Sequence, residues 1–346
     1  MIGVKKNLSR YGTIEIANIH PFSNLVNGFK ISPYMQEKMV FIGQNDCYGI
    51  GSEQLSRLLL VPVNSMQLFR VTNRYGKILE DDKVLNVDAI EDESLGIDKQ
   101  ECVYAMVDGS MLFIREDKWK EVKVGRVFKE SDCLEIGGER GWIKNSIYET
   151  YLGGSGIFTN RMDRLLSPYT AITQRLIFIC DGAKWIWKWI AQAYPEAVQI
   201  LDWYHAIEHL NEFARSYFKD VEQRKKWVKK QKEQLYQSHT DQVLKTIRDL
   251  KCKTKDNKEA QRLLVQYYQE NKCRMDYKKY RNIGTGTFSS GPIESAHREV
   301  IQKRMKLSGQ MWTKSGAQNM LTLRSTHLSG KWDKVLQLIC QTKIAA

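Results

Sequence analysis

The pattern of apolar and polar positions makes the beginning of the chain helical. Short amphipathic stretches lie at residues 34–42 and 52–60, and a third, at 66–75, follows the polar residues Asn64 and Ser65. The second and third stretches have the rhythm of a helix-turn-helix, although any small helical bundle shows the same rhythm. We therefore expect a small all-α N-terminal domain over residues 1–99, with a possible helix-turn-helix.

The middle of the chain changes to strand patterns. Residues 102–114 form an apolar run, residues 118–128 alternate, and residues 141–152 are a candidate third strand. A helix at 158–173, interrupted near Pro168, precedes two buried strands at 176–180 and 198–201, which flank a Trp-rich helix at 183–194. The order β-β-β-α-β-α-β predicts an α/β, RNase H-like fold, with a mixed sheet whose antiparallel strands come first.

The remaining chain reads as helical and basic. Residues 204–280 contain the densest clusters of Lys and Arg in the chain. A Gly-, Thr- and Ser-rich loop covers 284–291, and Pro292 opens a helix that reaches about residue 306. Two further short helices are expected within 313–339. We expect the first part of the catalytic core at 100–205, a large α-helical insertion at 206–283, and the rest of the core with its helical tail at 284–346.

Charge narrows the class of partner. The chain has 346 residues, a net charge of +13 and 42% hydrophobic residues, which excludes a disordered protein and favours a phosphate-rich partner such as nucleic acid. Simple solubility is the alternative reading of the charge. No apolar run is long enough to cross a bilayer, and the seven cysteines form no CxxC pair, so we expect a cytoplasmic protein with reduced thiols.

Two aspartates lie in or directly after apolar strands, where an unpaired carboxylate would be unfavourable. Asp108 lies inside the first apolar strand and Asp181 directly follows the strand at 176–180; each precedes a glycine. Both Asp-Gly pairs are compatible with plain turns. Their position on two apolar strands instead favours a metal site, because a buried charge is costly unless it is paired or binds a metal. Glu294, on the late helix, fits as a third carboxylate for divalent ions acting on a phosphodiester.

Three segments of the chain resemble the Mutator-like group of insertion-sequence transposases. They read MVDGS at 106–110, CDGAKWI at 180–186 with LDWYH at 201–205, and GPIESAH at 291–297. The resemblance implies a DDE transposase that cleaves DNA at the ends of a mobile element and joins it to a new site. It also implies that Asp108, Asp181 and Glu294 are catalytic and hold two Mg²⁺ or Mn²⁺ ions.

The same resemblance assigns supporting roles and partners. Asp202 and His205 match a DxxH signature, in which His205 either contacts the scissile phosphate or pairs with Asp202 as a helix cap. The implied partner is double-stranded DNA, as element termini and target, bound at the bacterial nucleoid by a homodimer or higher oligomer.

Basic and aromatic residues complete the expected DNA contacts, with core packing or a solvated face as the alternative for each. The expected set is Arg224, Lys225, Lys226, Lys229, Lys230, Lys303, Arg304, Lys306 and Trp312. Two other functions stay open: a nuclease or resolvase on the same core, and a non-catalytic DNA-binding protein from a decayed element.

Overall fold

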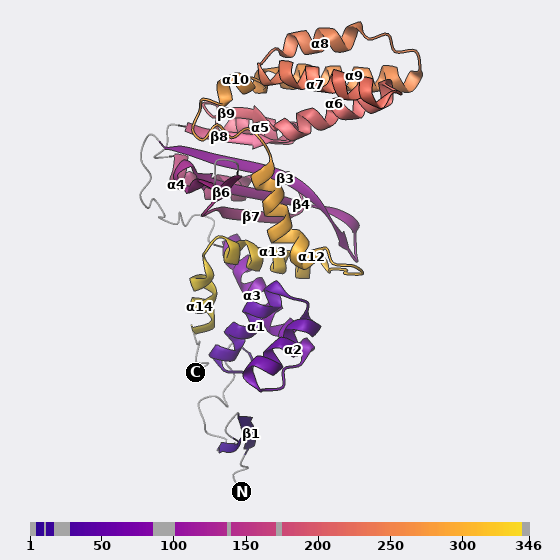
Figure 1. Cartoon of the computed structure of the whole chain (residues 1–346). Coiled ribbons are helices and arrows are strands. Elements are labelled where there is room, and N and C mark those ends of the chain that lie inside the picture. The colour runs from indigo at the N-terminus through magenta and orange to yellow at the C-terminus, as the bar shows by residue number, and fades with distance from the viewer. Residues whose placement is uncertain are drawn as a thin grey trace.

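The chain is arranged as a central sheet with helices at both of its ends. The computed structural model describes residues 5–9, 12–16, 28–85, 101–136, 140–170 and 175–340. Figure 1 shows the helices of the insertion beyond one edge of the sheet and the first helices of the chain at the opposite end. Across these ranges, no helix combines the length and apolar character that a membrane crossing requires.

The central sheet has five strands in the order β7-β4-β3-β8-β9. Antiparallel β3 (Cys102–Ile114), β4 (Lys118–Lys129) and β7 (Ile147–Leu152) are followed by parallel β8 (Arg175–Cys180) and β9 (Val198–Leu201). The predicted α/β class with a mixed sheet is confirmed, and the arrangement is compatible with an RNase H-like fold. The expected third strand at 141–152 is instead two strands, because β6 (Arg140–Ile143) leaves the sheet to pair with β5 (Cys133–Ile136).

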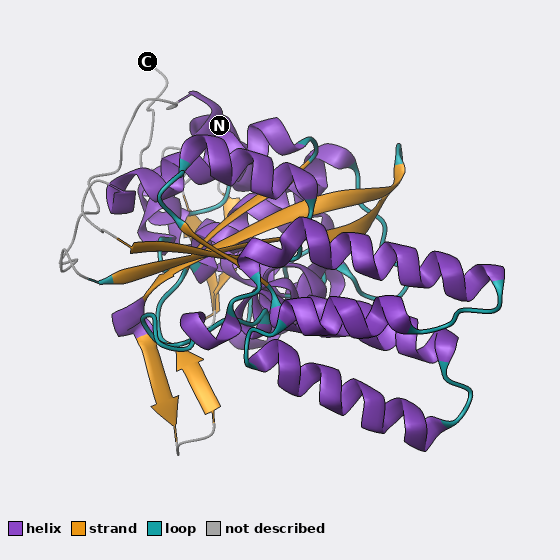
Figure 2. Cartoon of the chain, turned by 90° about the horizontal axis from the view of Figure 1, so that it is seen from above, coloured by secondary structure: helices purple, strands orange, loops and turns teal. Residues whose placement is uncertain are grey.

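Helices lie on both faces of this sheet (Figure 2). On one face, α4 (Ser155–Thr170) packs so closely that a Cβ at Gly125 would lie 2.2 Å from Met162 Sδ; α5 (Lys184–Ala193) follows β8. On the other face, Arg126 donates to the carbonyl of Pro292 in α11 (Gly291–Ala296). The expected interruption near Pro168 is wrong, because α4 continues to Thr170; the expected residues beyond it, 171–173, lie outside the described part.

The insertion between β9 and α11 is helical, as its composition suggests. It contains α6 (Trp203–Tyr217), α7 (Val221–Tyr236), α8 (Thr240–Asp249), α9 (Lys255–Asn271), the turn η3 (Lys272–Arg274) and α10 (Tyr277–Tyr280). The hydroxyl of Tyr268 on α9 donates to the carbonyl of Ala206 on α6 over 2.7 Å, and the Tyr267 hydroxyl donates to the carbonyl of Asp181. The first bond holds α9 against α6, and the second ties the insertion to the end of β8.

The first and last helices of the chain share one core. Helices α1 (Pro33–Asn45), α2 (Tyr48–Leu59) and α3 (Ser65–Leu85) pack with apolar side chains of α13 (Lys314–Leu328) and α14 (Trp332–Cys340), including Val335 and Ile339. Helices α3 and α13 cross closely, since a Cβ at Gly76 would lie 2.7 Å from the carbonyl oxygen of Asn319. The remaining short elements are the hairpin β1 (Lys5–Ser9) and β2 (Gly12–Ile16), the turn η2 (Glu130–Asp132), the π-helical turn η4 (His297–Gln302) and α12 (Lys303–Met305).

Candidate active site

Three aspartates stand at one level on three neighbouring strands. Val107 pairs with Cys180 and Cys180 pairs with Leu201, so Asp108, Asp181 and Asp202 each follow a residue of the same register row. The backbone N–H of Asp202 donates to the carbonyl of Cys180 over 2.8 Å, which continues the parallel ladder by one more bond. The parallel pairing therefore brings these carboxylates to one level of the sheet, just beyond the paired ends of β8 and β9 and in the middle of the longer β3.

Asp181 sits in a tight turn between β8 and α5. Its Oδ1 accepts a hydrogen bond from the backbone N–H of Ala183 over 2.9 Å, while Gly182 between them adopts φ +97°. Burial raises the pKa of Asp181 above its ordinary value, and the neighbouring Asp108 carboxylate raises it further. A cation placed between these two acids would relieve both effects.

Asp202 and His205 form a capped pair at the start of α6. Asp202 is 1% exposed; its Oδ2 accepts from the backbone N–H of His205 over 2.9 Å and lies 2.7 Å from His205 Nδ1. The bond to Asp202 raises the pKa of His205 to about 9 against the lowering effect of burial, and Asp108 and Asp181 add to the rise. His205 is thus an imidazolium at neutral pH, and the structure shows the capping arrangement with its positive charge close to the acidic site.

Glu294 faces a large groove rather than the two aspartates. The groove, about 1080 Å³, lies between α6, α7 and the start of α11, and Glu294 and Gly291 line it. Ser290 Oγ donates to Glu294 Oε1 over 2.9 Å. Among the described residues, no three His, Cys, Asp or Glu side chains come together to hold a metal ion. The two aspartates fit as metal ligands, but in this conformation the three expected acids do not form one metal site.

His297 is a site residue that the sequence analysis missed. It lies one turn beyond Glu294, is 6% exposed, and places Nε2 at 3.0 Å from Asp108 Oδ2. The contact ties the helix that carries Glu294 to the strand that carries Asp108. A signal was present, because residues three apart on a helix share a face, so His297 is carried close to any site that Glu294 reaches.

The wall of the groove is basic. Five cationic side chains line it, with Glu208 and Glu294 as the acidic members: Arg215, Arg224, Lys225, Lys229 and Lys232. Tyr204, whose side chain is 54% exposed, lies on the same wall. Three of the expected contacts in the insertion therefore face the groove, and Arg215 and Lys232 join them.

Lys226 and Lys230 do not line the groove. At about 100° per residue, Lys226 and Lys230 are turned about 120° and 160° around the axis of α7 from Lys232, which lines the groove. Lys232 was recognisable from sequence, because it continues the face of Lys225 and Lys229 at helical spacing.

Of the DNA contacts expected beyond Glu294, two are buried and two lie at the surface. Arg304 is 1% exposed, donates to the carbonyl of Gly43 and lies over the rings of Tyr48 and Trp312. Trp312 itself is 7% exposed and donates to the carbonyl of Met305. Both belong to the interior, so the expectation that they contact DNA is not supported.

The two lysines of this segment stay at the surface. Lys303 pairs with Glu299 over 2.6 Å, and Lys306 Nζ donates to Ser110 Oγ, two residues beyond Asp108. Lys306 thus lies on the side of the aspartates, while the charge of Lys303 is partly matched. Trp203 packs edge-on against Tyr236, Tyr277 and Phe288, so its ring belongs to the core.

Part of the chain matches a known protein family. Residues 163–315 match the model of a transposase family of the DDE type, the ISL3 family. The match includes Asp181, Asp202, His205 and Glu294, and it begins after Asp108. The match supports an insertion-sequence DDE transposase, and the family that it names is ISL3, whereas the sequence analysis expected a resemblance to the Mutator-like group. No curated protein was found that matches the chain.

Proposed function

We propose that this chain is the transposase of an insertion sequence, which cleaves phosphodiester bonds at the element ends and joins them to target DNA. One observation carries the proposal: within a chain that matches a transposase family, Glu294 lines a groove whose wall bears five cations. The groove begins at α6, the helix that Asp202 caps beside Asp108 and Asp181. A phosphodiester backbone is the partner that such a wall selects, because each neutralised phosphate releases counterions.

Different side chains near the groove are assigned different roles on the DNA. Lys229 and its neighbours on α7 hold the backbone, and Tyr204 offers an exposed ring beside it. His205, fixed by Asp202, presents a positive charge toward Asp108 and Asp181, where negative charge gathers on a scissile phosphate. We also propose that the protein acts on DNA as a homodimer or higher oligomer, as expected from the sequence.

Divalent ions belong to the proposal as an expectation about Asp108 and Asp181. When bound, two ions would neutralise charge on the attacking and leaving oxygens of the phosphodiester. Glu294 completes their ligand set only if it leaves Ser290, to which it is bonded in this structure. A titration of cleavage against Mg²⁺ and Mn²⁺ tests the requirement directly.

The deciding experiment compares three single variants in a strand-cleavage and joining assay with element-end DNA. We expect Asp108→Asn, Asp181→Asn and Glu294→Gln each to lose cleavage while keeping DNA binding, because they remove ligand charge from the proposed site. Glu208→Gln is the matched control, since Glu208 lines the same groove without a proposed catalytic role. Full cleavage by any of the three variants removes that residue from the site.

A second candidate is a DNA-binding protein without cleavage activity. It is favoured by the bond between Ser290 and Glu294 and by the lack of any three-residue metal-binding group in the described ranges. The same assay separates it, since such a protein binds element ends but cuts nothing at any metal concentration. A nuclease or resolvase would cut in that assay without joining the ends to a target.

A further inference from the structure

The late helix, residues 291–305, contains a π-helical turn in its middle. In this helix η4 separates α11 from α12. The backbone N–H of Lys303 donates to the carbonyl of Arg298, five residues earlier, whereas an α-helix would bond it to the carbonyl of Glu299. The carbonyl of Glu299 has thus lost its α-helical partner.

Arg324 of α13 supplies donors to this turn. Its Nη2 donates to the carbonyl of Glu299, and its Nε donates to the carbonyl of Val300 over 2.7 Å. Its Nη1 donates over 2.6 Å to the carbonyl of Gln44, near the end of α1. Arg324 is 3% exposed, so one buried guanidinium connects the π-helical turn with the N-terminal helices.

Backbone carbonyls, rather than a carboxylate, satisfy this guanidinium. Burial and the neighbouring Arg304 lower the pKa of Arg324 to about 10, against the raising effect of Glu299. The Glu299 carboxylate itself pairs with Lys303 and Arg298. Burying such a charge is costly, so its hydrogen bonds to the turn and to α1 are what it contributes.

The flank beyond the turn is fixed, whereas the flank before it can rotate. On the far side, Arg304 of α12 donates to the carbonyl of Gly43. A π-helical turn holds about one residue more than an α-helical turn. If it relaxed to an α-helix, the segment with Glu294 and His297 would therefore turn by about one residue, or about 100°.

His297 holds Asp108 from this segment. Its Nε2 lies 3.0 Å from Asp108 Oδ2, while the backbone N–H of Gly109 donates to Oδ1 over 2.6 Å. His297 Nδ1 is buried and has no hydrogen-bond partner among the described residues. An ionised carboxylate only accepts, so the proton of the ring belongs on Nε2. Both oxygens of Asp108 are thus oriented, and each keeps lone pairs for a cation.

We infer that His297 is a positioning residue that orients the Asp108 carboxylate, and that Arg324 holds the π-helical turn that brings His297 there. The inference rests on the proposed function, in which Asp108 is a metal ligand. Removing the hydrogen-bond partner of a ligand carboxylate typically costs about 10–100-fold in metal affinity or activity. Loss of the contact should therefore slow strand cleavage at least tenfold and leave DNA binding unchanged.

NMR of the histidine rings tests the contact without any need for cleavage. Two-bond proton–nitrogen spectra of chelator-treated, isotope-labelled protein distinguish the two ring nitrogens, and the spectrum of His297→Gln assigns the signals of His297. We expect Nε2 to carry the proton in the wild type. The same signals should move in Arg324→Lys, because one lysine nitrogen cannot serve all the carbonyls that the guanidinium reaches.

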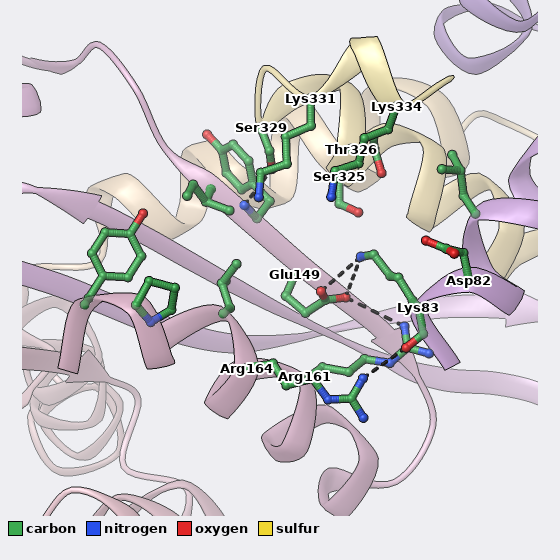
Figure 3. A pocket seen from close by; sticks show the side chains of 16 residues that line it. Asp82, Lys83, Glu149, Arg161, Arg164, Ser325, Thr326, Ser329, Lys331 and Lys334 are labelled. Carbon is green, nitrogen blue, oxygen red and sulfur yellow. Dashed lines mark hydrogen bonds and ion pairs between the residues drawn. The ribbon is translucent and has the colours of Figure 1, made fainter. Parts of the chain in front are cut away.

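Arg161→Lys is the matched control for the loss of a buried guanidinium. Arg161 is 6% exposed and lies on α4, where it pairs with Glu149 of β7 (Figure 3). It makes no bond to the late helix within the described residues. Its variant should leave the ring signals of His297 where they are.

Cleavage of element-end DNA provides the functional measurement. We expect the cleavage rate constant of His297→Leu and of Arg324→Lys to fall at least tenfold, with an unchanged Kd for DNA. His297→Gln should recover most of that loss, because its amide N–H can replace the N–H at Nε2. Arg161→Lys should cleave like the wild type.

The outcomes separate this inference from the proposed function. A proton on Nδ1, unmoved His297 signals in Arg324→Lys, or wild-type cleavage by His297→Leu overturns the inference. If Arg324→Lys fails to fold, Gln44→Met replaces it, because it removes only the side-chain acceptor 3.3 Å from Nη1. The His297 signals should move in this variant too, by less, and unmoved signals would again overturn the inference. If the wild type cuts no DNA, the proposed function fails, and the ring spectra alone decide the positioning roles.

Discussion

Replacing Lys229 and Lys232 by Gln removes two positive charges from the groove wall without disturbing an ion pair. Within the described residues, neither ammonium pairs with a carboxylate, and both side chains line the groove. The two residues rise about 4.5 Å along the helix axis. Phosphates of one strand are spaced about 3.4 Å along a duplex, so two neighbouring phosphates are within reach of the pair.

The expected effect is on the salt dependence of binding. Each lost phosphate contact lowers the slope of log affinity against log salt by about 0.9, so the double variant should lose about 1.8. Between 50 and 200 mM salt, its affinity should therefore fall about tenfold less than that of the wild type. The change is independent of sequence, because phosphate contacts carry no base readout.

The matched control is the double variant Lys226→Gln with Lys230→Gln. It removes the same charge from the same helix, but neither of these lysines lines the groove. Fluorescence anisotropy with a random-sequence duplex over a salt series measures both slopes. Equal slopes for the groove pair and the control pair would refute the placement of DNA in this groove.

Two further predictions concern stability. The pKa of His205 is raised to about 9, so its ion pair with Asp202 stabilises the fold fully below pH 6.5 and this stabilisation is lost as the pH rises through 9. His205→Ala should therefore remove that alkaline loss of stability, which is worth up to about 3 kcal/mol, when chelator-treated proteins are melted over a pH series. Unchanged pH dependence of melting would show that the pair contributes nothing. Gly76→Ala should cost about 1–3 kcal/mol, since its Cβ would lie 2.7 Å from the Asn319 carbonyl oxygen, which outweighs the gain in helix propensity. Gly49→Ala, with open space around its Cβ, should cost nothing in the same urea titration.

The sequence predicts the parts of this fold that local pattern controls. The strand at 102–114 is found at the same bounds, because apolar residues lie on both sides of Asp108–Ser110 and the residues just outside the strand, Glu101 and Arg115, are charged. The third strand was misjudged, since the split at residues 144–146 depends on which partner each half finds. Helix α4 passes Pro168 because Ser167 Oγ donates to the carbonyl of Arg164, the acceptor that the proline cannot serve.

In the candidate site, too, local pattern predicted some residues, while distant contacts decided others. Asp108 and Asp181 were recognisable from sequence as acids inside or directly after apolar strands, whereas Asp202 was assigned only through the resemblance. The burial of Arg304 was not recognisable, since its partners Gly43 and Tyr48 lie some 260 residues earlier in the chain and no local pattern reports them. The contact between His297 and Asp108 likewise depends on how a helix crosses the sheet.

The core shared by the first and last helices also determines when the N-terminal helices can fold during protein synthesis. Val335 and Ile339 pack among side chains of α1 and α3, so those early helices leave the ribosome long before their last partners exist. Until then they must wait with an apolar face uncovered or bound to a chaperone. A frameshift or stop codon late in the gene would therefore remove more than a tail: it would leave the N-terminal helices of the nascent chain without a complete core.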